Sequence, residues 1–240
     1  MTSSNESTDL KQAEKAEVVD YFNGMGFDRW NRIYSQSQDV NNVQKNIRVG
    51  HQKTVDDVLN WVNEAGSLKD ISFCDAGCGV GSLTIPLAKM GAGSISASDI
   101  SKSMVEETKR RAEEEGVDLT NLRFTISDLE NLKGSFHTVI CLDVFIHYQQ
   151  NAAEEMVRHL CGITQERLIV SFAPYTPFLA ILKRIGQLFP GPSKTTRAYT
   201  LREIGIVLAA RECGFEPIRR KLNQAPFYFS KLIEFRKCKK

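Results

Sequence analysis

The length, composition and charge of this 240-residue sequence narrow the kind of protein that it can be. Hydrophobic residues make up 42% of it, enough for one sizeable core, which favours one large α/β domain over a disordered chain. The formal net charge of +2 excludes a strongly basic nucleic-acid-binding protein. With no signal or transit peptide and no run of 18 apolar residues, we expect a cytoplasmic protein with reduced cysteines. The six cysteines match no zinc-site spacing, so we expect no protein-bound metal.

The charge is distributed unevenly along the chain. Residues 174–240 contain 14 Lys and Arg against 4 Asp and Glu, whereas residues 1–173 carry a net negative charge. A basic C-terminal third favours an anionic substrate or an acidic partner surface in that region. The alternative is an ordinary solvated face that ends in a basic tail.

The N-terminal quarter of the chain is expected to be helical. Residues 1–17 are rich in Ser, Glu and Lys and are typical of a disordered lead-in. Apolar residues at helical spacing from Val18 to Phe22 predict a short helix that ends near Gly24. A longer amphipathic helix is expected over residues 41–64, before any strand.

Strands and helices alternate from residue 71 onward, which predicts a mostly parallel seven-stranded sheet with helices on both faces. A final pair of strands around residue 225 is expected to supply an antiparallel edge strand. Capping boxes spanning residues 103–106 and 200–203 are expected to start two of the helices. The expected strands cover residues 71–74, 95–98, 122–126, 138–142, 168–172, 215–222 and 227–235, and the expected helices cover residues 82–90, 101–115, 151–160 and 200–214.

One segment, residues 176–199, interrupts this alternation. It joins an apolar, helix-like run to Pro190-Gly191-Pro192 and follows the fifth expected strand. That position lies over the carboxyl end of the sheet, where α/β proteins bind their ligands. We therefore expect a helical insertion on the substrate side of the site.

The turn after the first expected strand contains a glycine-rich motif, Asp75-Ala-Gly77-Cys-Gly79-Val-Gly81. Glycines let the backbone turn tightly and let a ligand approach without side-chain collision. The spacing is Gly-x-Gly-x-Gly, which differs from the Gly-x-Gly-x-x-Gly typical of dinucleotide-binding proteins. The preceding acid suits a cationic ligand better than a phosphate. The motif therefore favours S-adenosylmethionine, which carries a sulfonium and an ammonium group, over a nicotinamide cofactor.

Two more acidic residues follow the next two expected strands. Asp99 stands at the end of the second strand, where a carboxylate could accept hydrogen bonds from two ribose hydroxyls. Asp128 follows the third strand and could accept a hydrogen bond from an adenine amino group. Each acid could instead be only a helix N-cap or a surface residue. Taken together with the glycine turn, the three acids favour a ligand-binding site along the ends of these strands.

Residues 68–235 resemble the class I S-adenosylmethionine-dependent methyltransferases in this glycine motif and these acids. The resemblance implies a Rossmann-like fold, S-adenosyl-L-methionine as the cofactor and S-adenosyl-L-homocysteine as the product. It also implies cofactor contacts in the glycine turn and after the second, third and fourth strands. The residues expected to bind the cofactor are Asp75, Gly77, Cys78, Gly79, Asp99, Ile100, Met104, Asp128, Leu129, Leu142, Asp143 and Val144.

Several further segments are distinctive and extend over nearly the whole chain. They are Asp20-Tyr-Phe-Asn23, Gly26-Phe-Asp-Arg-Trp30, Arg32-Ile-Tyr34, Val43-Gln44, Asn46-Ile47-Arg48, Gly50-His51, Cys141-Leu-Asp-Val144, Ile146-His147-Tyr148, Phe172-Ala-Pro174 and Thr196-Arg197-Ala198-Tyr199. These segments resemble the magnesium-protoporphyrin IX O-methyltransferases of cyanobacterial type. The resemblance implies esterification of one propionate of the porphyrin, giving the 13-monomethyl ester of chlorophyll biosynthesis. It also implies an N-terminal helical arm over residues 1–64 and a methyltransferase domain over residues 65–240.

The resemblance further implies which residues face the substrate. Tyr34 in the arm and His147 after the fourth strand are expected to position the substrate or handle protons, and replacing either should reduce turnover without abolishing it. The alternatives are a core tyrosine and a histidine in a capped loop. Trp30 and His51 are further candidates. Cations of the insertion are expected to bind the anionic substrate: Lys183, Arg184, Lys194 and Arg197.

The chemistry of a propionate agrees with the residues present. With a pKa of about 4.3, a propionate is already ionised at neutral pH and can attack a methyl group directly. Alignment and desolvation can then supply most of the catalysis. A phenol, with a pKa of about 10, would need a base or a metal ion, and the sequence contains no evident cluster of metal ligands.

Three other interpretations remain open. The chain could be another small-molecule O-methyltransferase, such as one acting on a quinone precursor, or a nicotinamide-dependent oxidoreductase. It could also be a porphyrin-binding protein without catalytic activity. For the family function, we expect the porphyrin-binding subunit of magnesium chelatase as a partner, weak peripheral attachment to photosynthetic membranes, and no nucleic acid.

Overall fold

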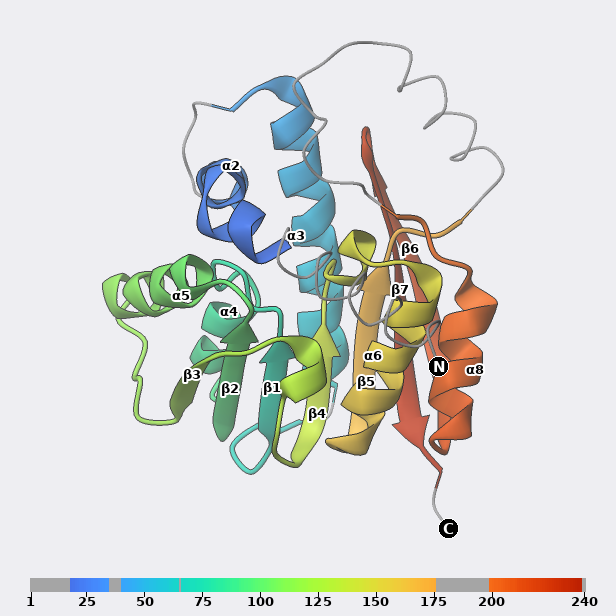
Figure 1. Cartoon of the computed structure of the whole chain (residues 1–240). Helices are drawn as coiled ribbons and strands as arrows, with labels where there is room; N and C mark the ends of the chain where they lie inside the picture. Colours follow the sequence, from blue (N-terminus) through green and yellow to red (C-terminus); the bar gives the residue numbers. More distant parts are fainter. Residues whose placement is uncertain (1–17, 35–39, 65, 176–198, 239–240) are drawn as a thin grey trace, which may run out of the picture.

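A computed structural model describes the chain at residues 18–34, 40–64, 66–175 and 199–238 (Figure 1). The described residues form one seven-stranded sheet with the strand order β3-β2-β1-β4-β5-β7-β6, so the expected α/β fold is confirmed. The strands are β1 (Ser72–Ala76), β2 (Ser94–Asp99), β3 (Leu122–Ile126), β4 (Phe136–Cys141), β5 (Thr164–Phe172), β6 (Phe215–Ala225) and β7 (Tyr228–Lys237). The helices are α2 (Met25–Tyr34), α3 (Asn42–Asn63), α4 (Thr84–Lys89), α5 (Lys102–Glu114), α6 (Gln150–Gly162) and α8 (Glu203–Glu212), with short 3-10 turns η1 (Leu129–Asn131) and η2 (Phe145–His147).

The antiparallel strand of the sheet is β7, and it does not lie at the edge. Strands β1 to β5 pair in parallel, whereas β7 runs antiparallel to both β5 and β6. The final strand pair therefore supplies the expected antiparallel pairing at the edge of the sheet, with β6 outermost and β7 inside it. After α8 the chain forms the edge strand β6. A tight turn between Ala225 and Tyr228 then leads into β7, which lies between β5 and β6.

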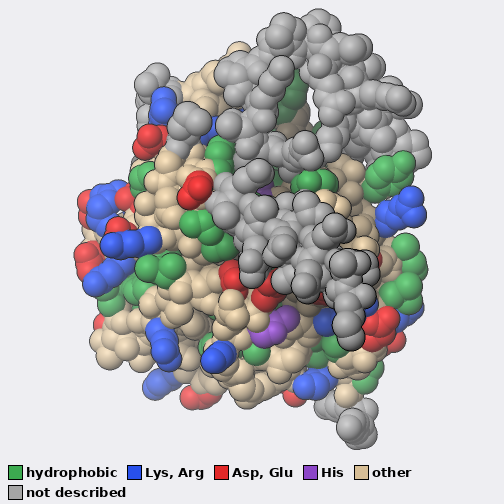
Figure 2. Space-filling view, in the orientation of Figure 1, with side chains coloured by type: hydrophobic (Ala, Val, Ile, Leu, Met, Phe, Trp, Pro, Cys, Tyr) green, Lys and Arg blue, Asp and Glu red, His purple; other side chains and the backbone are tan. Residues whose placement is uncertain are grey.

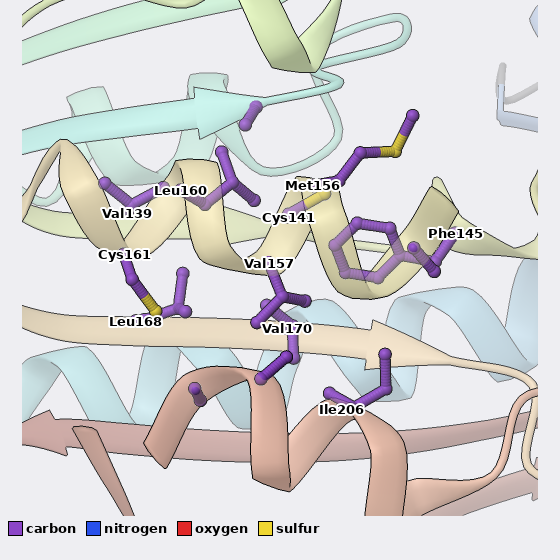
Figure 3. Packing of buried hydrophobic residues seen from close by; sticks show 14 of the residues in the cluster. Val139, Cys141, Phe145, Met156, Val157, Leu160, Cys161, Leu168, Val170 and Ile206 are labelled. Carbon is purple, nitrogen blue, oxygen red and sulfur yellow. The ribbon is translucent and has the colours of Figure 1, made fainter. Parts of the chain in front are cut away.

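Two apolar layers hold helices against opposite faces of the sheet. On one face α6 and α8 cover β4 and β5. There Leu160 of α6 lies beside Val139 and Val157 lies beside Val170, and Ile206 of α8 belongs to the same cluster (Figure 3). On the other face α3 packs against the sheet through Val55, Val58 and Val62. The same cluster includes apolar residues of β1 and α4. Because helices cover both faces, β1 and β4 are buried at consecutive positions along most of their length. The domain boundary expected after residue 64 stays a prediction.

The sequence predicts some of the N-terminal helices but not all of them. Residues 18–23 are helical, as expected, and α3 matches the helix expected over residues 41–64. Helix α2 was not expected, because Gly24 and Gly26 resemble a turn and its buried positions are few. None of the helices within the described ranges combines the length and the apolar character needed to cross a membrane.

The predicted caps are wrong in both places. Helix α5 is capped by Ser101, whose Oγ accepts a hydrogen bond from the Met104 amide at 3.3 Å, so the expected box at 103–106 already lies inside the helix. Helix α8 begins after Arg202, which makes no side-chain capping bond. A capping box does start α3, between Asn41 and Gln44.

Candidate functional site

A cavity of about 560 Å³ lies at the carboxyl ends of the central strands. One wall is formed by the glycine turn after β1, the ends of β2 and β3, and the loop after β4. The opposite wall comes from residues 18–34, the N-terminal half of α3 and the β6–β7 hairpin. This volume falls in the range of small-molecule sites, which makes the cavity the candidate active site.

The glycine turn gives the first wall its shape. The amides of Gly77 and Cys78 both donate to the Ser98 carbonyl at 2.8 Å, which folds the turn back against β2. Gly77 has φ +87°, and a Cβ there would lie 2.2 Å from Cγ2 of Val144. A Cβ on Gly79 would meet no described atom within 4 Å. The turn therefore packs against the loop after β4 at Gly77 and leaves open space at Gly79.

Asp99 at the end of β2 is held by backbone donors. Its Oδ2 accepts from the Gly79 amide at 3.0 Å and its Oδ1 accepts from the Ser101 amide at 2.9 Å. Burial raises the pKa of this carboxyl, although these amides act in the opposite direction. Each carboxylate oxygen has about two acceptor sites, so each can accept one more hydrogen bond from a ligand that enters the cavity.

The other two acids occupy different positions. Asp128 lines the cavity and also caps η1, with its Oδ1 accepting from the Asn131 amide at 2.9 Å. Asp75 is not part of the cavity wall, because the central strand β1 carries it into the core and Oγ1 of Thr84 donates to its Oδ2 at 2.6 Å. Burial raises the pKa of Asp75 to about 6. The structure therefore places Asp75 behind the wall, not at the contact surface where we expected it.

Asp143 is the centre of a buried hydrogen-bond network after β4. Its carboxylate accepts from Nδ1 of His51 at 2.9 Å and from the Tyr228 hydroxyl at 2.7 Å. It also accepts from Ser171 at 2.7 Å and Ser230 at 2.8 Å. Burial alone would raise its pKa, but these donors outweigh burial and lower the pKa to about 2. Asp143 therefore stays ionised and ties together α3, β5 and β7.

The backbone at Asp143 is also unusual. Its φ is +58°, a left-handed conformation that costs a non-glycine residue about 1–2 kcal/mol. This conformation turns the chain sharply after β4, so that Val144 faces the glycine turn and His147 lines the cavity. The network around the carboxylate offsets the strain and fixes the direction of this loop.

His51 of α3 has both ring nitrogens engaged. Nδ1 contacts Asp143, and Nε2 lies 2.9 Å from the hydroxyl of Ser82, just after the glycine turn. The carboxylate can only accept, so Nδ1 donates to Asp143, while Nε2 and the Ser82 hydroxyl share the second hydrogen bond. His51 therefore joins α3 to the loop after β4 and to the glycine turn. The sequence indicated His51 only as a candidate site residue and did not predict these contacts.

Tyr34 faces this network from the end of α2. The centroid of its ring lies 4.4 Å from that of His51. The ring also stacks on Trp30, with 5.5 Å between the two centroids. Burial, reinforced by the Asp143 carboxylate, raises the pKa of the Tyr34 phenol well above its usual value. Tyr34 therefore remains a neutral hydroxyl in this environment.

Two arginines hold the end of α2 that carries Tyr34. Arg111 of α5 donates to the Tyr34 carbonyl at 3.1 Å and also to the carbonyl and side chain of Asn31. Arg48 of α3 donates to the carbonyls of Ile33 and Arg32. Cations at a helix C-terminus satisfy its free carbonyls and favour its dipole. We call these two residues the arginine clamp.

His147 lines the cavity from η2, after β4. Its ring centroid lies 5.0 Å from that of Phe22, edge to face. Burial lowers the pKa of His147 to about 4, against a smaller opposing effect of Asp143. The imidazole is therefore neutral near pH 7 and only weakly basic.

The structure brings most of the expected site residues to one cavity. Tyr34, His147 and all the expected cofactor residues except Asp75 line it. Residues that the sequence did not single out there include Ser82, Phe227 and Tyr228. The expected substrate-binding cations lie outside the described residues: Lys183, Arg184, Lys194 and Arg197.

The charges of the basic C-terminal third are largely paired where the structure describes them. Arg219 pairs with Glu64 and Glu234, and Lys221 pairs with Asp57. Acidic and basic side chains are also interspersed along α5, at the left of Figure 2. Within the described ranges, no group of three or more His, Cys, Asp or Glu residues is arranged to hold a metal ion.

Comparisons with known proteins agree with this architecture. A family model described as "Methyltransferase domain" matches residues 73–166, and one described as "Magnesium-protoporphyrin IX methyltransferase C-terminus" matches residues 141–237. The chain is 50% identical to the magnesium-protoporphyrin O-methyltransferase of Synechocystis, over 92% of this chain and 95% of that protein. The chain belongs to the magnesium-protoporphyrin IX methyltransferase family.

Other members of the family support the same assignment. The chloroplastic magnesium protoporphyrin IX methyltransferase of Arabidopsis thaliana is 49% identical, over 92% of this chain and 70% of that protein. The crystal structure of the Synechocystis methyltransferase with bound SAH matches with a TM-score of 0.87 and 48% identity. That match covers 93% of this chain and 100% of the other, so the class I methyltransferase fold is confirmed.

Proposed function

We propose that this chain transfers a methyl group from S-adenosyl-L-methionine to a propionate carboxylate of magnesium protoporphyrin IX, giving the 13-monomethyl ester. The Synechocystis and Arabidopsis relatives are named for a magnesium-protoporphyrin substrate. Structures of the Synechocystis relative contain SAM or SAH. S-adenosyl-L-homocysteine is then the second product.

The residues of the cavity suit this cofactor. Open space beside Gly79 lets a ligand lie against the backbone, and Asp99 can accept hydrogen bonds from ribose hydroxyls. Trp30 lines the cavity, and its Nε1 is buried with no hydrogen-bond partner among the described residues. We assign the adenosine end to Asp99, Ile100, Met104, Asp128 and Leu129. The methionine end is assigned to Gly77, Cys78, Leu142, Asp143 and Val144, with Asp143 acting by orienting the loop.

The observation that carries the choice of a carboxylate is the lack of an available imidazole base among the described cavity residues. Both nitrogens of His51 are occupied by Asp143 and Ser82. His147 is a weak base with a pKa of about 4. A phenol could not lose its proton readily to either group, whereas a propionate is already ionised. This arrangement favours a carboxylate over the phenol of a quinone precursor.

The chemistry then depends on alignment. S-adenosyl-L-methionine supplies a methyl group activated by a positively charged sulfur. A carboxylate oxygen bonds to that carbon as the carbon–sulfur bond breaks, and no proton has to be moved. Tyr34 and His147, both uncharged, orient the carboxylate by hydrogen bonding, while the apolar walls exclude water. Arg29 lines the cavity and brings a positive charge to it, which favours an anionic acceptor.

The test is to incubate the purified chain with labelled S-adenosylmethionine and magnesium protoporphyrin IX and to identify the product by chromatography. We expect a monomethyl ester, and we expect Tyr34→Phe and His147→Gln to slow its formation without abolishing it. Binding of S-adenosylhomocysteine without ester formation would overturn the substrate assignment. Faster methylation of a catechol would favour the quinone-precursor alternative.

We also propose that the porphyrin arrives from the porphyrin-binding subunit of magnesium chelatase, at a site peripheral to photosynthetic membranes. The family resemblance is the support for this partner. Addition of the porphyrin-loaded subunit should accelerate ester formation beyond the rate with the same free porphyrin concentration. Equal rates with and without the subunit would contradict this partnership but leave the methyl transfer unaffected.

A further inference from the structure

The β6–β7 hairpin extends beyond the carboxyl edge of the sheet. The last residue of β5, Phe172, pairs with Lys231, whereas β6 and β7 continue to pair as far as Ala225 and Tyr228. The hairpin therefore projects past its neighbours on the side where the cavity lies, beside α3 (Figure 1). Its tip forms part of the cavity mouth.

Phe227 at this tip is both exposed and strained. Its side chain is 68% exposed, the most of the large exposed hydrophobic residues described. Its φ is +66°, a conformation that favours glycine and costs other residues about 1–2 kcal/mol. Phe227 nevertheless lines the cavity. A bulky aromatic residue that contributes neither burial nor relaxed geometry to the fold points to a role in binding.

The hairpin tip is held in place by its neighbours. The Tyr228 hydroxyl bonds to Asp143 and lies 2.9 Å from Oγ1 of Thr54. Nδ2 of Asn223 donates to the same Thr54 oxygen at 3.2 Å. A Cβ on Gly50 would lie 2.3 Å from the Tyr228 ring, so glycine there allows the hairpin to approach α3. Phe227 is therefore presented on a rigid support, which lowers the entropic cost of binding.

An apolar surface from α3 lines the same cavity. Val43 and Ile47 are four residues apart and therefore lie on one face of that helix. Val43 is 38% exposed, and Phe229 of β7 adds a second aromatic ring to the lining. The two elements supply apolar surface, which suits a flat hydrophobic ligand better than a polar one.

The order of the strands separates this surface from the cofactor residues. Gly77, Asp99 and Asp128 follow β1, β2 and β3, whereas the hairpin lies across β4 and β5 from them. His147, after β4, stands between the two ends. A methyl donor at the first end and an acceptor at the second would therefore meet near His147.

We propose that Phe227, supported by Val43 and Ile47, is a substrate-binding residue against which the flat ring of the methyl acceptor packs. This inference rests on the proposed function, because it takes the acceptor to be a porphyrin. The exposed ring contributes contact area at little cost in side-chain entropy, while the carboxylate reaches inward to Tyr34 and His147. The residues assigned to the cofactor follow β1, β2, β3 and β4 and are distinct from this subsite.

The experiment measures porphyrin and cofactor binding separately in Phe227→Ala and Phe227→Gly. We expect the KM and the dissociation constant for magnesium protoporphyrin IX to rise about tenfold, with kcat and S-adenosylhomocysteine affinity nearly unchanged. Phe227→Trp should retain porphyrin binding. Phe227→Gly should also raise the melting temperature, because glycine relieves the left-handed φ.

The matched control is Leu222→Ala, which removes an exposed apolar residue of the same hairpin outside the described cavity lining. We expect it to bind the porphyrin like the wild type. Wild-type porphyrin affinity in folded Phe227→Ala would overturn the subsite, as would an equal loss in Leu222→Ala. If the wild-type chain itself binds no porphyrin and forms no ester, the proposed function fails before this subsite is in question.

Discussion

The two walls of the cavity are built on different principles. The cofactor-side wall is held mainly by backbone: the glycine turn folds onto the Ser98 carbonyl, and Asp99 accepts from amides two and twenty residues away. The opposite wall is held by side chains from distant parts of the chain. His51 and Tyr228 meet Asp143 across 92 and 85 residues.

This difference has a functional consequence. Backbone geometry makes the cofactor side a fixed template, whereas the opposite wall depends on one carboxylate and on the arginine clamp. A wall built from helix ends and a hairpin can change its shape when a few hydrogen bonds are lost. We therefore expect substitutions on the two sides to affect different properties: cofactor affinity on one side, and stability and turnover on the other.

The largest effect is expected from removing the carboxylate of Asp143. Asp143→Ala leaves His51, Tyr228 and two serine hydroxyls without their common acceptor in the core. The free energy of unfolding should fall by about 3–5 kcal/mol, as measured in urea. Because hydrogen bonds hold the folded-state pKa near 2, below the unfolded value, this stabilisation is present at neutral pH and is lost as the pH falls toward 2.

The control for this prediction is Ser230→Ala, which removes one of the donors and keeps the carboxylate. It should cost only about 1 kcal/mol. If the two variants were equally stable, the network would not depend on Asp143, and the contrast between the two walls would be weaker than we infer.

On the cofactor side, Gly77→Ala should have the next largest effect. The new Cβ would lie 2.2 Å from Val144, and the φ of +87° is unfavourable for alanine. Displacement of the Val144 loop should lower S-adenosylhomocysteine affinity by about 100-fold, measured by calorimetry. Gly79→Ala is the comparison, since its Cβ meets no described atom and its φ of +53° is also left-handed.

The Gly79 variant should fold normally, so any loss of affinity in it reports a ligand that occupies the open space. Wild-type affinity in Gly77→Ala would show that the turn and the Val144 loop can separate without consequence. The cofactor-side wall would then not be the fixed template that its backbone hydrogen bonds indicate.

The same distinction explains what the sequence could and could not predict. The glycine spacing and Asp99 are local signals, and both lie where the sequence placed them, on the cavity. The alternation of strands and helices likewise predicted the sheet. Asp75 has the same local signal, but its side chain points into the core, a direction that spacing alone does not give.

The opposite wall carried no comparable local signal. The contact between His51 and Asp143 exists only after α3 and β4 pack together, and no spacing rule joins residues 92 apart. Helix α2 was missed because Gly24 and Gly26 resemble a turn, while the arginine clamp that secures its end comes from α3 and α5. The order of β6 and β7 also depends on packing, since a hairpin can join a sheet by either strand.

A smaller effect should separate the two arginines of α5. Arg110 and Arg111 both pair with Glu107, and of these two arginines it is Arg111 that donates to Asn31 and to the Tyr34 carbonyl. Arg111→Ala should loosen the end of α2 and lower kcat about tenfold, because Tyr34 is no longer held in place. Cofactor affinity should be nearly unchanged.

Arg110→Ala is the matched control, and its turnover should stay within about twofold of the wild type, because exposed ion pairs contribute little. Steady-state kinetics with both substrates would measure kcat and KM for each variant. Equal losses of kcat in the two variants would assign the effect to Glu107 instead of to the clamp. A loss of cofactor affinity in Arg111→Ala would remove the functional separation between the two walls.

The smallest effect on function is expected for Asp75, the acid behind the cofactor-side wall, because its replacement should change stability and leave cofactor binding intact. Burial raises its folded-state pKa to about 6, so folding is opposed at neutral pH, where the carboxyl is charged, and is favoured as the pH falls through 6. Asp75→Asn removes that charge while its amide oxygen can still accept from Thr84. The free energy of unfolding at pH 7 should therefore rise by about 1–3 kcal/mol, and the gain should disappear below pH 4.

Urea unfolding at the two pH values measures this difference, and calorimetry with S-adenosylhomocysteine shows whether Asp75 touches the cofactor. Because the carboxyl lies outside the cavity wall, affinity should be unchanged. A stable Asp75→Asn variant that binds the cofactor poorly would make Asp75 a direct contact, as its position in the glycine motif first indicated. The cofactor-side wall would then depend on a buried charge as well as on its backbone, and would resemble the opposite wall more closely than the geometry implies.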